Sequence, residues 1–201
     1  TATRFELSLH LALLLDELKA AREDGLTCLV DAGIRPPRTG AEFEEARNLS
    51  KQSSLHLVMA WGSTSANWVG ERTEEDITAE LLRDAKAQRW GAFGEVASGL
   101  KGITPNEGKM LRALAKVHLA IGMPIFTHTD HHGCAKCGLD QLELFEAAGV
   151  NPKSVCIGHM LDPTPEQDPG MQARKTIAKR GAFVGLDTVG LFRGNRTLRE
   201  G

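Results

Sequence analysis

Six short apolar runs recur along this chain, and the segments between them have the hydrophobic spacing of α-helices. The runs begin about 30 residues apart, which is the length of a strand, a helix and their connecting loops. They lie at residues 26–31, 55–60, 92–96, 124–127, 155–158 and 182–186. A chain with this alternation forms parallel strands covered by helices, so the sequence predicts an α/β fold.

The segments between the runs also carry signals for where helices begin and end. Residues 5–22 hold leucines at helical spacing, which predicts an amphipathic helix ahead of the first strand. Thr73 and Thr104 are each followed three residues later by an acidic residue, the pattern of an N-terminal cap, and Pro105 suits the first helical position. Gly122 lies where a helix would end in a left-handed cap.

Two parallel architectures fit this alternation, an open doubly wound sheet and a closed barrel. An open sheet of this kind usually has a glycine-rich phosphate loop after its first strand, and residues 31–37 are not one. A barrel instead gathers polar residues at the carboxyl ends of its strands. The strand ends here are Asp31, Glu95, His128, His159 and Asp187. We therefore predict a (β/α)8 TIM-barrel type of fold, with about six of the eight βα units present.

Three of these strand ends, Glu95, His128 and His159, are candidate metal ligands. They follow three successive predicted strands and are separated by about 30 residues, or one βα unit each. Two imidazoles and a carboxylate are a donor set for zinc or a similar divalent ion. The structural alternative is a polar barrel rim that binds no metal.

The charge and hydropathy of the chain argue against two classes of partner. With 24 Lys and Arg against 26 Asp and Glu, the formal net charge is −2, unlike that of a dedicated nucleic-acid binder. The longest leucine-rich stretch, at residues 11–15, is far shorter than the roughly 20 apolar residues that cross a bilayer. No secretory signal pattern is seen, so we expect a cytoplasmic protein that binds neither nucleic acid nor a membrane.

The four cysteines, Cys28, Cys134, Cys137 and Cys156, are too few for a disulfide scaffold and predict free thiols in a reducing compartment. Cys134 and Cys137 form a Cys-x-x-Cys motif beside His131-His132, which has the ligand types of a small zinc site. The alternative is a substrate-facing loop with two free thiols. Both interpretations stay open at this point.

Several segments resemble the phosphotriesterase-related branch of the amidohydrolase superfamily. The most specific are Pro-x-x-Thr-His-Thr at residues 124–129 and Ile-Gly-His at 157–159. Phe-Gly-Glu at 93–95, Ile-Thr-Pro at 103–105 and Gly-Leu-Asp-Thr at 185–188 also match, in the same order along the chain. The resemblance extends from Gly25 to Gly190.

This resemblance implies a centre of two divalent metal ions, usually zinc, in the barrel. It implies that His128 and His159 bind one ion and that Glu95 bridges the two, where many members have a carbamylated lysine. Such ions lower the pKa of a shared water, which gives a hydroxide nucleophile near neutral pH. Asp162 and Asp187 are similar in place to the acidic residues of the family's proton relay. As structural alternatives, Asp162 begins a turn and Asp187 caps a helix.

Two parts of the family's metal centre have no counterpart in this sequence. No His-x-His motif precedes the first predicted helix, and no Asp-bearing final strand follows Gly190. We therefore expect residues 1–201 to be one metal-dependent hydrolase barrel domain that is truncated at both ends. We expect it to supply at most one metal site and the bridge, and to hydrolyse substrates weakly.

The first functional hypothesis is a metal-dependent hydrolase of a small phosphoester, carboxyl ester or lactone, with a homodimer as the candidate assembly. A TatD-like deoxyribonuclease is an alternative, because it also combines a strand-4 glutamate with histidines from strands 5 and 6. The low positive charge weighs against it. A non-catalytic barrel that binds a small ligand and keeps a vestigial metal site is the third hypothesis.

Overall fold

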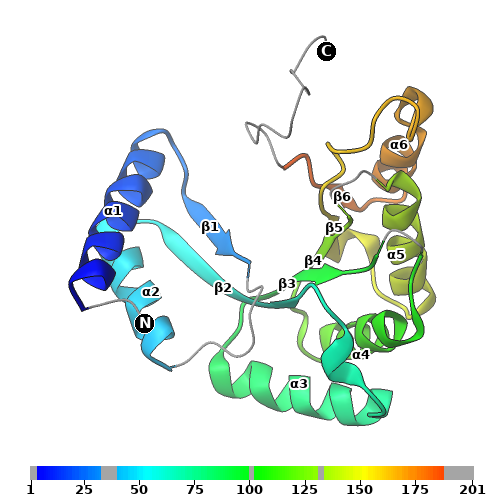
Figure 1. Cartoon of the computed structure of the whole chain (residues 1–201), viewed down its shortest axis with the longest axis horizontal. Coiled ribbons are helices and arrows are strands. Elements are labelled where there is room, and N and C mark those ends of the chain that lie inside the picture. The colour runs from blue at the N-terminus through cyan, green and yellow to red at the C-terminus, as the bar shows by residue number, and fades with distance from the viewer. Residues whose placement is uncertain (1–3, 33–39, 100–101, 131–133, 188–201) are drawn as a thin grey trace.

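The computed structural model describes residues 4–32, 40–99, 102–130 and 134–187. Within these residues, six parallel strands form one curved sheet in the order β1-β2-β3-β4-β5-β6 (Figure 1). The strands are β1 Cys28–Asp31, β2 His56–Ser63, β3 Ala92–Ala97, β4 Ile125–His128, β5 Val155–Ile157 and β6 Phe183–Val184. Each strand pairs with its neighbours in the sequence, as in a barrel and unlike a doubly wound sheet.

The helices lie along the outer side of the curved sheet (Figure 1). They are α1 Arg4–Glu23, α2 Gly40–Ser53, α3 Glu74–Gln88, α4 Pro105–Ile121, α5 Ala135–Ala147 and α6 Gln172–Lys179. Short 3-10 helices are Asn67–Val69, Pro152–Ser154 and Pro169–Met171. Helix α1 precedes β1, and the helices α2 to α6 each connect one strand to the next. The predicted barrel-type α/β fold is confirmed for the described part of the chain, with six parallel strands, the first five of which are each followed by a helix.

The helix boundaries follow the local signals in the sequence. Thr104 and Glu107 form a capping box at the start of α4, with each side chain bonded to the other residue's backbone N–H. At the start of α3, the Thr73 hydroxyl accepts a hydrogen bond from the backbone N–H of Asp76. Gly122 ends α4 with φ of 77°, a left-handed conformation that glycine adopts without a steric penalty.

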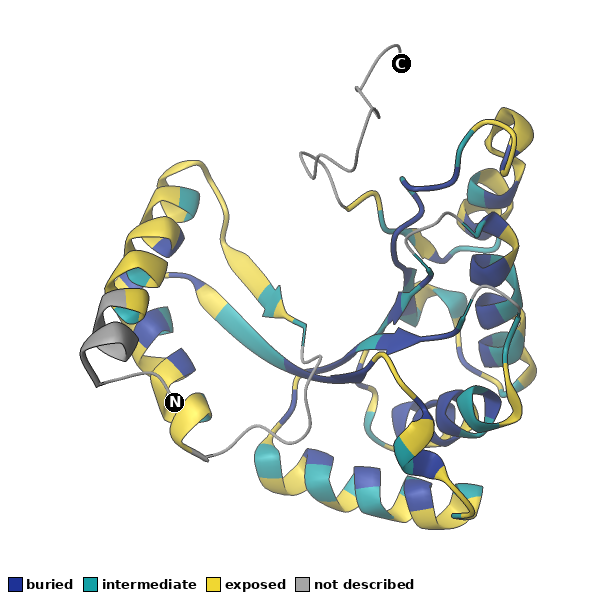
Figure 2. Ribbon diagram, in the orientation of Figure 1, coloured by how far each residue is buried: buried dark blue, intermediate teal, exposed yellow. Residues whose placement is uncertain are grey.

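The main hydrophobic core lies between β3, β4 and β5 and the helices α3 to α6 outside them. Phe93, Leu111, Ile125, Phe145 and Ile157 are fully buried in it. A second, smaller cluster joins α1 to α2 and β2, and Figure 2 shows that residues 10–23 of α1 and all of β1 are mostly exposed. The core is therefore best packed around the three central strands, which carry the predicted metal ligands.

The observed strands differ from the predicted ones at their ends: β2 extends three residues beyond the predicted end at residue 60, to Ser63, and both edge strands are shorter than predicted. The first begins at Cys28 rather than residue 26, and the last contains only Phe183 and Val184. The last strand ends at Val184 because its partner there, Ile157, is the last residue of β5. No helix among the described residues is both long and apolar enough to cross a bilayer.

Candidate metal centre

The strand register brings Glu95, His128 and His159 to one edge of the sheet. Glu95 lies in β3, His128 ends β4, and His159 follows β5 by two residues. Ala97 is paired with His128, and Thr127 is paired with Ile157, so the carboxyl ends of the three strands are level. One ligand atom from each of the three residues lies within 4.8 Å of the others.

The three side chains point toward one another. The distance from His128 Nδ1 to Glu95 Oε2 is 3.1 Å, and that from His159 Nε2 to His128 Nδ1 is 2.9 Å. His159 Nε2 also lies 3.4 Å from Glu95 Oε1. The two imidazole rings meet edge to face, with centroids 4.5 Å apart. Three donor atoms that converge in this way can be satisfied together by one cation.

Glycines allow the backbones to approach closely beneath these side chains. A Cβ at Gly62, in β2, would overlap the backbone nitrogen of Glu95. A Cβ at Gly158 would overlap the carbonyl oxygen of Thr127, just before His128. Substitution of Gly62 would therefore push β2 away from Glu95 in β3, and substitution of Gly158 would push the end of β5 away from β4.

His159 has a left-handed backbone, with φ of 57°, and Asp187 holds it there. Both carboxylate oxygens of Asp187 accept the backbone N–H of His159 at 3.1 Å. One of them also lies 2.7 Å from the ring Nδ1 of His159. If Nδ1 carries the proton and donates it to Asp187, the lone pair of Nε2 faces Glu95 and His128, which is the tautomer that binds a metal.

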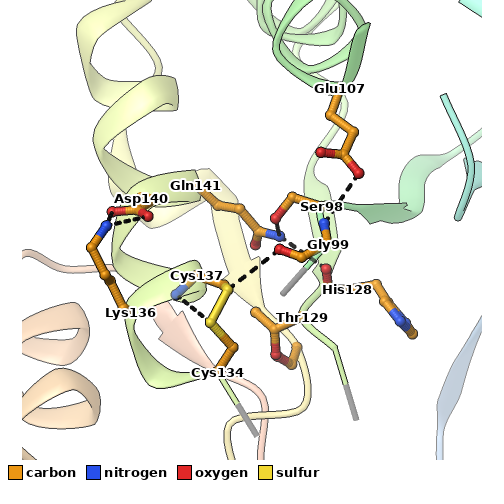
Figure 3. Close-up of a disulfide and its surroundings, with 11 residues drawn as sticks. Ser98, Gly99, Glu107, His128, Thr129, Cys134, Lys136, Cys137, Asp140 and Gln141 are labelled. Atoms are coloured by element: carbon orange, nitrogen blue, oxygen red, sulfur yellow. Dashed lines mark hydrogen bonds and ion pairs between the residues drawn. A yellow bond between two sulfur atoms is a disulfide. The ribbon is translucent and has the colours of Figure 1, made fainter. Parts of the chain in front are cut away.

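His128 is held in place by a buried glutamine, Gln141, that the sequence patterns did not single out. Its carbonyl oxygen accepts a hydrogen bond from Gln141 Nε2 at 2.9 Å, and Gln141 also donates to Ser98 Oγ at 2.8 Å (Figure 3). Gln141 is fully buried in α5. The next residue in the chain, Thr129, is also fully buried and donates its hydroxyl to the Gly158 carbonyl at 2.9 Å. The sequence contains one signal for the contact between Gln141 and His128, because Gln141 is a polar residue on the apolar face of a helix.

The electrostatics of the three side chains follow from these contacts. Hydrogen bonds from His128 and then His159 lower the pKa of Glu95 to about 2, although burial acts in the opposite direction. Burial would lower the pKa of His159, but hydrogen bonds to Asp187 and Glu95 outweigh it and raise this pKa to about 9. Without a metal, the site therefore holds an anionic glutamate beside a protonated His159 at neutral pH.

Asp187 and Asp162, the two predicted relay residues, have different relations to this centre. Burial would raise the pKa of Asp187, but its hydrogen bonds with His159 lower it below the usual value. Asp162 is buried, and its backbone N–H donates to the carbonyl of His159 at 3.2 Å. Asp31, at the end of β1, is not part of the three-residue group. Asp187 thus contacts a candidate ligand through its side chain, whereas the bond of Asp162 to His159 is made by its backbone.

A small cavity lies beside the candidate centre and has a volume of about 140 Å³. It is lined by Glu95 and Asp187 together with apolar or small residues, among them Phe126 and Cys156. Burial, and then the charge of Asp187, raise the pKa of the Cys156 thiol to about 11, so this thiol stays protonated at neutral pH.

The expectation of free thiols is wrong for two of the four cysteines. Cys134 and Cys137 form a disulfide, because the turn that begins α5 places their Cα atoms 5.2 Å apart (Figure 3). The same bond excludes a zinc site with both thiolates as ligands in this state, and His131 and His132 lie outside the described residues. Cys28 and Cys156 are free, as expected.

Comparison with known proteins adds independent findings. A model of the phosphotriesterase family matches residues 6–193. The chain is 39% identical over 199 residues to a phosphotriesterase homology protein of Mycobacterium tuberculosis, with 88% of this chain and 56% of that protein covered. It is 27% identical over 186 residues to an aryldialkylphosphatase of Saccharolobus solfataricus, with the same two coverages.

A solved structure supports the fold. It is that of a phosphotriesterase homology protein from Escherichia coli complexed with phosphate in its active site, and it superposes with a TM-score of 0.75 at 24% sequence identity. The match covers 90% of this chain and 62% of that one. The chain thus spans little more than half the length of the relatives it matches.

Proposed function

Because the chain belongs to the phosphotriesterase family, we propose that it is a metal-dependent hydrolase whose metal ligands are Glu95, His128 and His159. The observation that carries the proposal is the convergence of these three side chains at the carboxyl ends of β3, β4 and β5, with ligand atoms within 4.8 Å of one another. We propose zinc as the ion, since two imidazoles and a carboxylate suit it.

The chain's own residues would prepare this site in three ways. Glu95 supplies a carboxylate that stays ionised down to a pH of about 2. Asp187 holds the Nδ1 proton of His159 and so directs Nε2 inward. The hydrogen bond from Gln141 fixes the backbone of His128. When bound, the ion supplies Lewis-acid activation of a water molecule and of the oxygen under attack.

We assign Asp187 and Asp162 to proton transfer around the reacting water, with Glu95 as the third catalytic residue. Asp187 is suited to this role because its side chain is 45% exposed and reaches the small cavity. It can therefore exchange a proton with water while it remains bonded to His159. Asp162 is buried only three residues after His159, and its role is the less strongly supported of the two.

The substrate class that we propose is a small phosphoester, carboxyl ester or lactone. The name of the Saccharolobus relative, an aryldialkylphosphatase, supports the phosphoester. The family match also favours this hypothesis over a TatD-like deoxyribonuclease. We also propose that the protein is cytoplasmic and forms a homodimer. Size-exclusion chromatography with light scattering tests the assembly, because it measures the mass of the particle in solution.

The test begins with the metal content of the purified chain, measured by mass spectrometry after dialysis against zinc. We expect one ion per chain in the wild type and its loss in Glu95→Gln, His128→Asn and His159→Asn. Glu75→Gln, which alters an exposed carboxylate of α3, is the matched control. Equal zinc content in all five proteins would contradict the ligand assignment, and two ions per chain would contradict a single site.

The hydrolase proposal needs a second assay, made on the full-length protein that contains this sequence. Paraoxon, an aryl carboxyl ester, an acyl-homoserine lactone and single-stranded DNA are offered in turn. We expect hydrolysis of at least one of the first three and its loss in Glu95→Gln. Cleavage of DNA alone would support the nuclease instead. Zinc binding with no hydrolysis of any substrate would support a non-catalytic barrel.

A further inference from the structure

The disulfide at the start of α5 has two sulfur atoms in unlike surroundings. Cys134, the N-terminal cap of the helix, is partly exposed, whereas Cys137 is only 2% exposed. The Cys134 sulfur accepts the backbone N–H of Cys137 at 3.2 Å. An external thiol can therefore reach Cys134 far more easily than Cys137.

The buried sulfur faces a hydrogen-bond acceptor that suits the reduced state. Cys137 Sγ lies 3.5 Å from the carbonyl oxygen of Gly99 (Figure 3). In the disulfide this sulfur carries no proton, so the contact is only a close approach; a reduced thiol there can donate its S–H to Gly99. Gly99 is itself held by a bond from its N–H to Glu107 of α4 at 3.1 Å. The surroundings can thus accommodate both redox states without a large rearrangement.

We propose that Cys134 and Cys137 form a reversible thiol–disulfide exchange site for small thiols and dithiols, with Cys134 as the sulfur that exchanges. In the first step, a thiolate of the external dithiol attacks Cys134 Sγ and forms a mixed disulfide. The bond between Cys134 and Cys137 breaks, and its electron pair stays on Cys137 Sγ, which takes a proton from water.

In the second step, water or buffer deprotonates the second thiol of the reagent. The resulting thiolate attacks the reagent sulfur that is bonded to Cys134. The reagent leaves as a cyclic disulfide, and Cys134 is released as a thiolate. The Cys137 N–H, at the start of the 13-residue helix α5, is placed to stabilise that thiolate. Once the Cys134 thiolate takes a proton from water, two electrons and two protons have passed in total from the dithiol to the protein. The reverse reaction with a small disulfide restores the bond.

The site lies against the support of the candidate metal centre. Gln141, one turn further along α5, donates to the His128 carbonyl and to Ser98, the residue before Gly99. The exchange chemistry itself is independent of metal binding, so its test does not depend on the proposed hydrolase function.

The first experiment uses the folded wild-type chain in buffers of reduced and oxidised dithiothreitol, followed by acid quenching, alkylation and peptide mapping. We expect Cys134 and Cys137 to be reduced and reoxidised together without denaturant, while circular dichroism stays unchanged. A disulfide that is reduced only after the chain unfolds, or thiols that do not reoxidise, would overturn the proposal.

The second experiment distinguishes the two sulfurs with oxidised glutathione. We expect Cys137→Ser to accumulate a glutathione adduct at Cys134 about tenfold or more faster than Cys134→Ser does at Cys137. Exposed Cys28 is an internal control. It has no partner cysteine like Cys137, whose thiol could displace glutathione from an adduct. In the reduced wild type, adducts should persist at Cys28 and not at Cys134. Equal rates in the two variants, or a lasting wild-type adduct at Cys134, would contradict the assignment.

Discussion

His159 combines three properties that rarely occur together in a residue with only a structural role. It has a left-handed backbone, its side chain is only 7% exposed, and its two ring nitrogens face different carboxylates. Burial opposes a charged imidazole, yet Asp187 and Glu95 together keep the pKa near 9. A buried histidine whose proton is held by two carboxylates is typical of a site where a metal ion can replace that proton.

The first prediction concerns the pH dependence of zinc affinity. Metal binding requires a neutral His159, and in the metal-free chain this residue is protonated below a pH of about 9. Glu95 is already ionised and does not contribute in this range. Zinc affinity should therefore rise about tenfold per pH unit between roughly pH 6 and 8, as measured by competition with a fluorescent chelator. An affinity that is constant over this range would be inconsistent with the prediction.

The second prediction concerns the carboxylate behind His159. Asp187→Asn removes the charge that favours protonated His159, so the pKa of His159 should fall in the metal-free chain, as followed by NMR. The same change weakens the hold on Nδ1 and should lower zinc affinity about 10- to 100-fold. Glu166→Gln, at an exposed carboxylate, is the control and should change neither quantity. If Asp187→Asn leaves the pKa of His159 unchanged, the proposed positioning role fails.

At the scale of elements, α5 links the disulfide to the ligand-bearing strands. Its apolar face packs on the sheet through Leu142 and Phe145. Gln141, on the same side, bonds to Ser98, the residue after β3, and to His128, which ends β4. A buried amide with two such bonds fixes the spacing of the two strands.

The third prediction follows from this link. Gln141→Leu should remove the hydrogen bonds from the amide to Ser98 Oγ and to the His128 carbonyl. The unfolding free energy, measured by denaturant titration, should fall by about 1–3 kcal/mol. The substitution should also lower zinc affinity, because His128 is then less well positioned. Glu143→Gln, on the exposed side of the same helix, should change neither value by much. Unchanged zinc affinity in Gln141→Leu would show that α5 does not position His128.

The parts of the fold that depend on local chemistry could be predicted from the sequence. Thr104, Glu107 and Gly122 act through their immediate neighbours, so their caps were expected. The three candidate ligands were found because their spacing equals the repeat of the fold. The support of His128 by Gln141 was missed because it depends on how α5 sits against the sheet. The disulfide could not be predicted because a Cys-x-x-Cys spacing fits free thiols or a metal site as well, and the pairing depends on the turn that brings the two Cα atoms to 5.2 Å.

At the scale of the whole molecule, the candidate centre lies within the best packed part of the chain. The strands β3 to β5 share the main core, whereas β1 and residues 10–23 of α1 are largely exposed (Figure 2). Leu29 in β1 and Phe183 in β6, for example, are 38% and 63% exposed. The candidate ligands are therefore held by the well-packed centre of the sheet rather than by its edges.

The fourth prediction is that zinc stabilises the whole fold. An ion that binds only the folded chain should add about 2.7 kcal/mol to the unfolding free energy at a concentration 100 times its dissociation constant. The melting temperature, measured by calorimetry, should rise with zinc and return to its starting value with a chelator. His159→Asn should show no such rise. An equal rise in this variant would place the stabilising ion elsewhere.

The most direct test of the metal centre is anomalous diffraction at the zinc edge from crystals of the zinc-loaded chain. We expect one strong peak at roughly 2.0–2.2 Å from a nitrogen of His128, a nitrogen of His159 and an oxygen of Glu95. No peak at saturating zinc, or a peak that contacts none of these three side chains, would contradict the assignment.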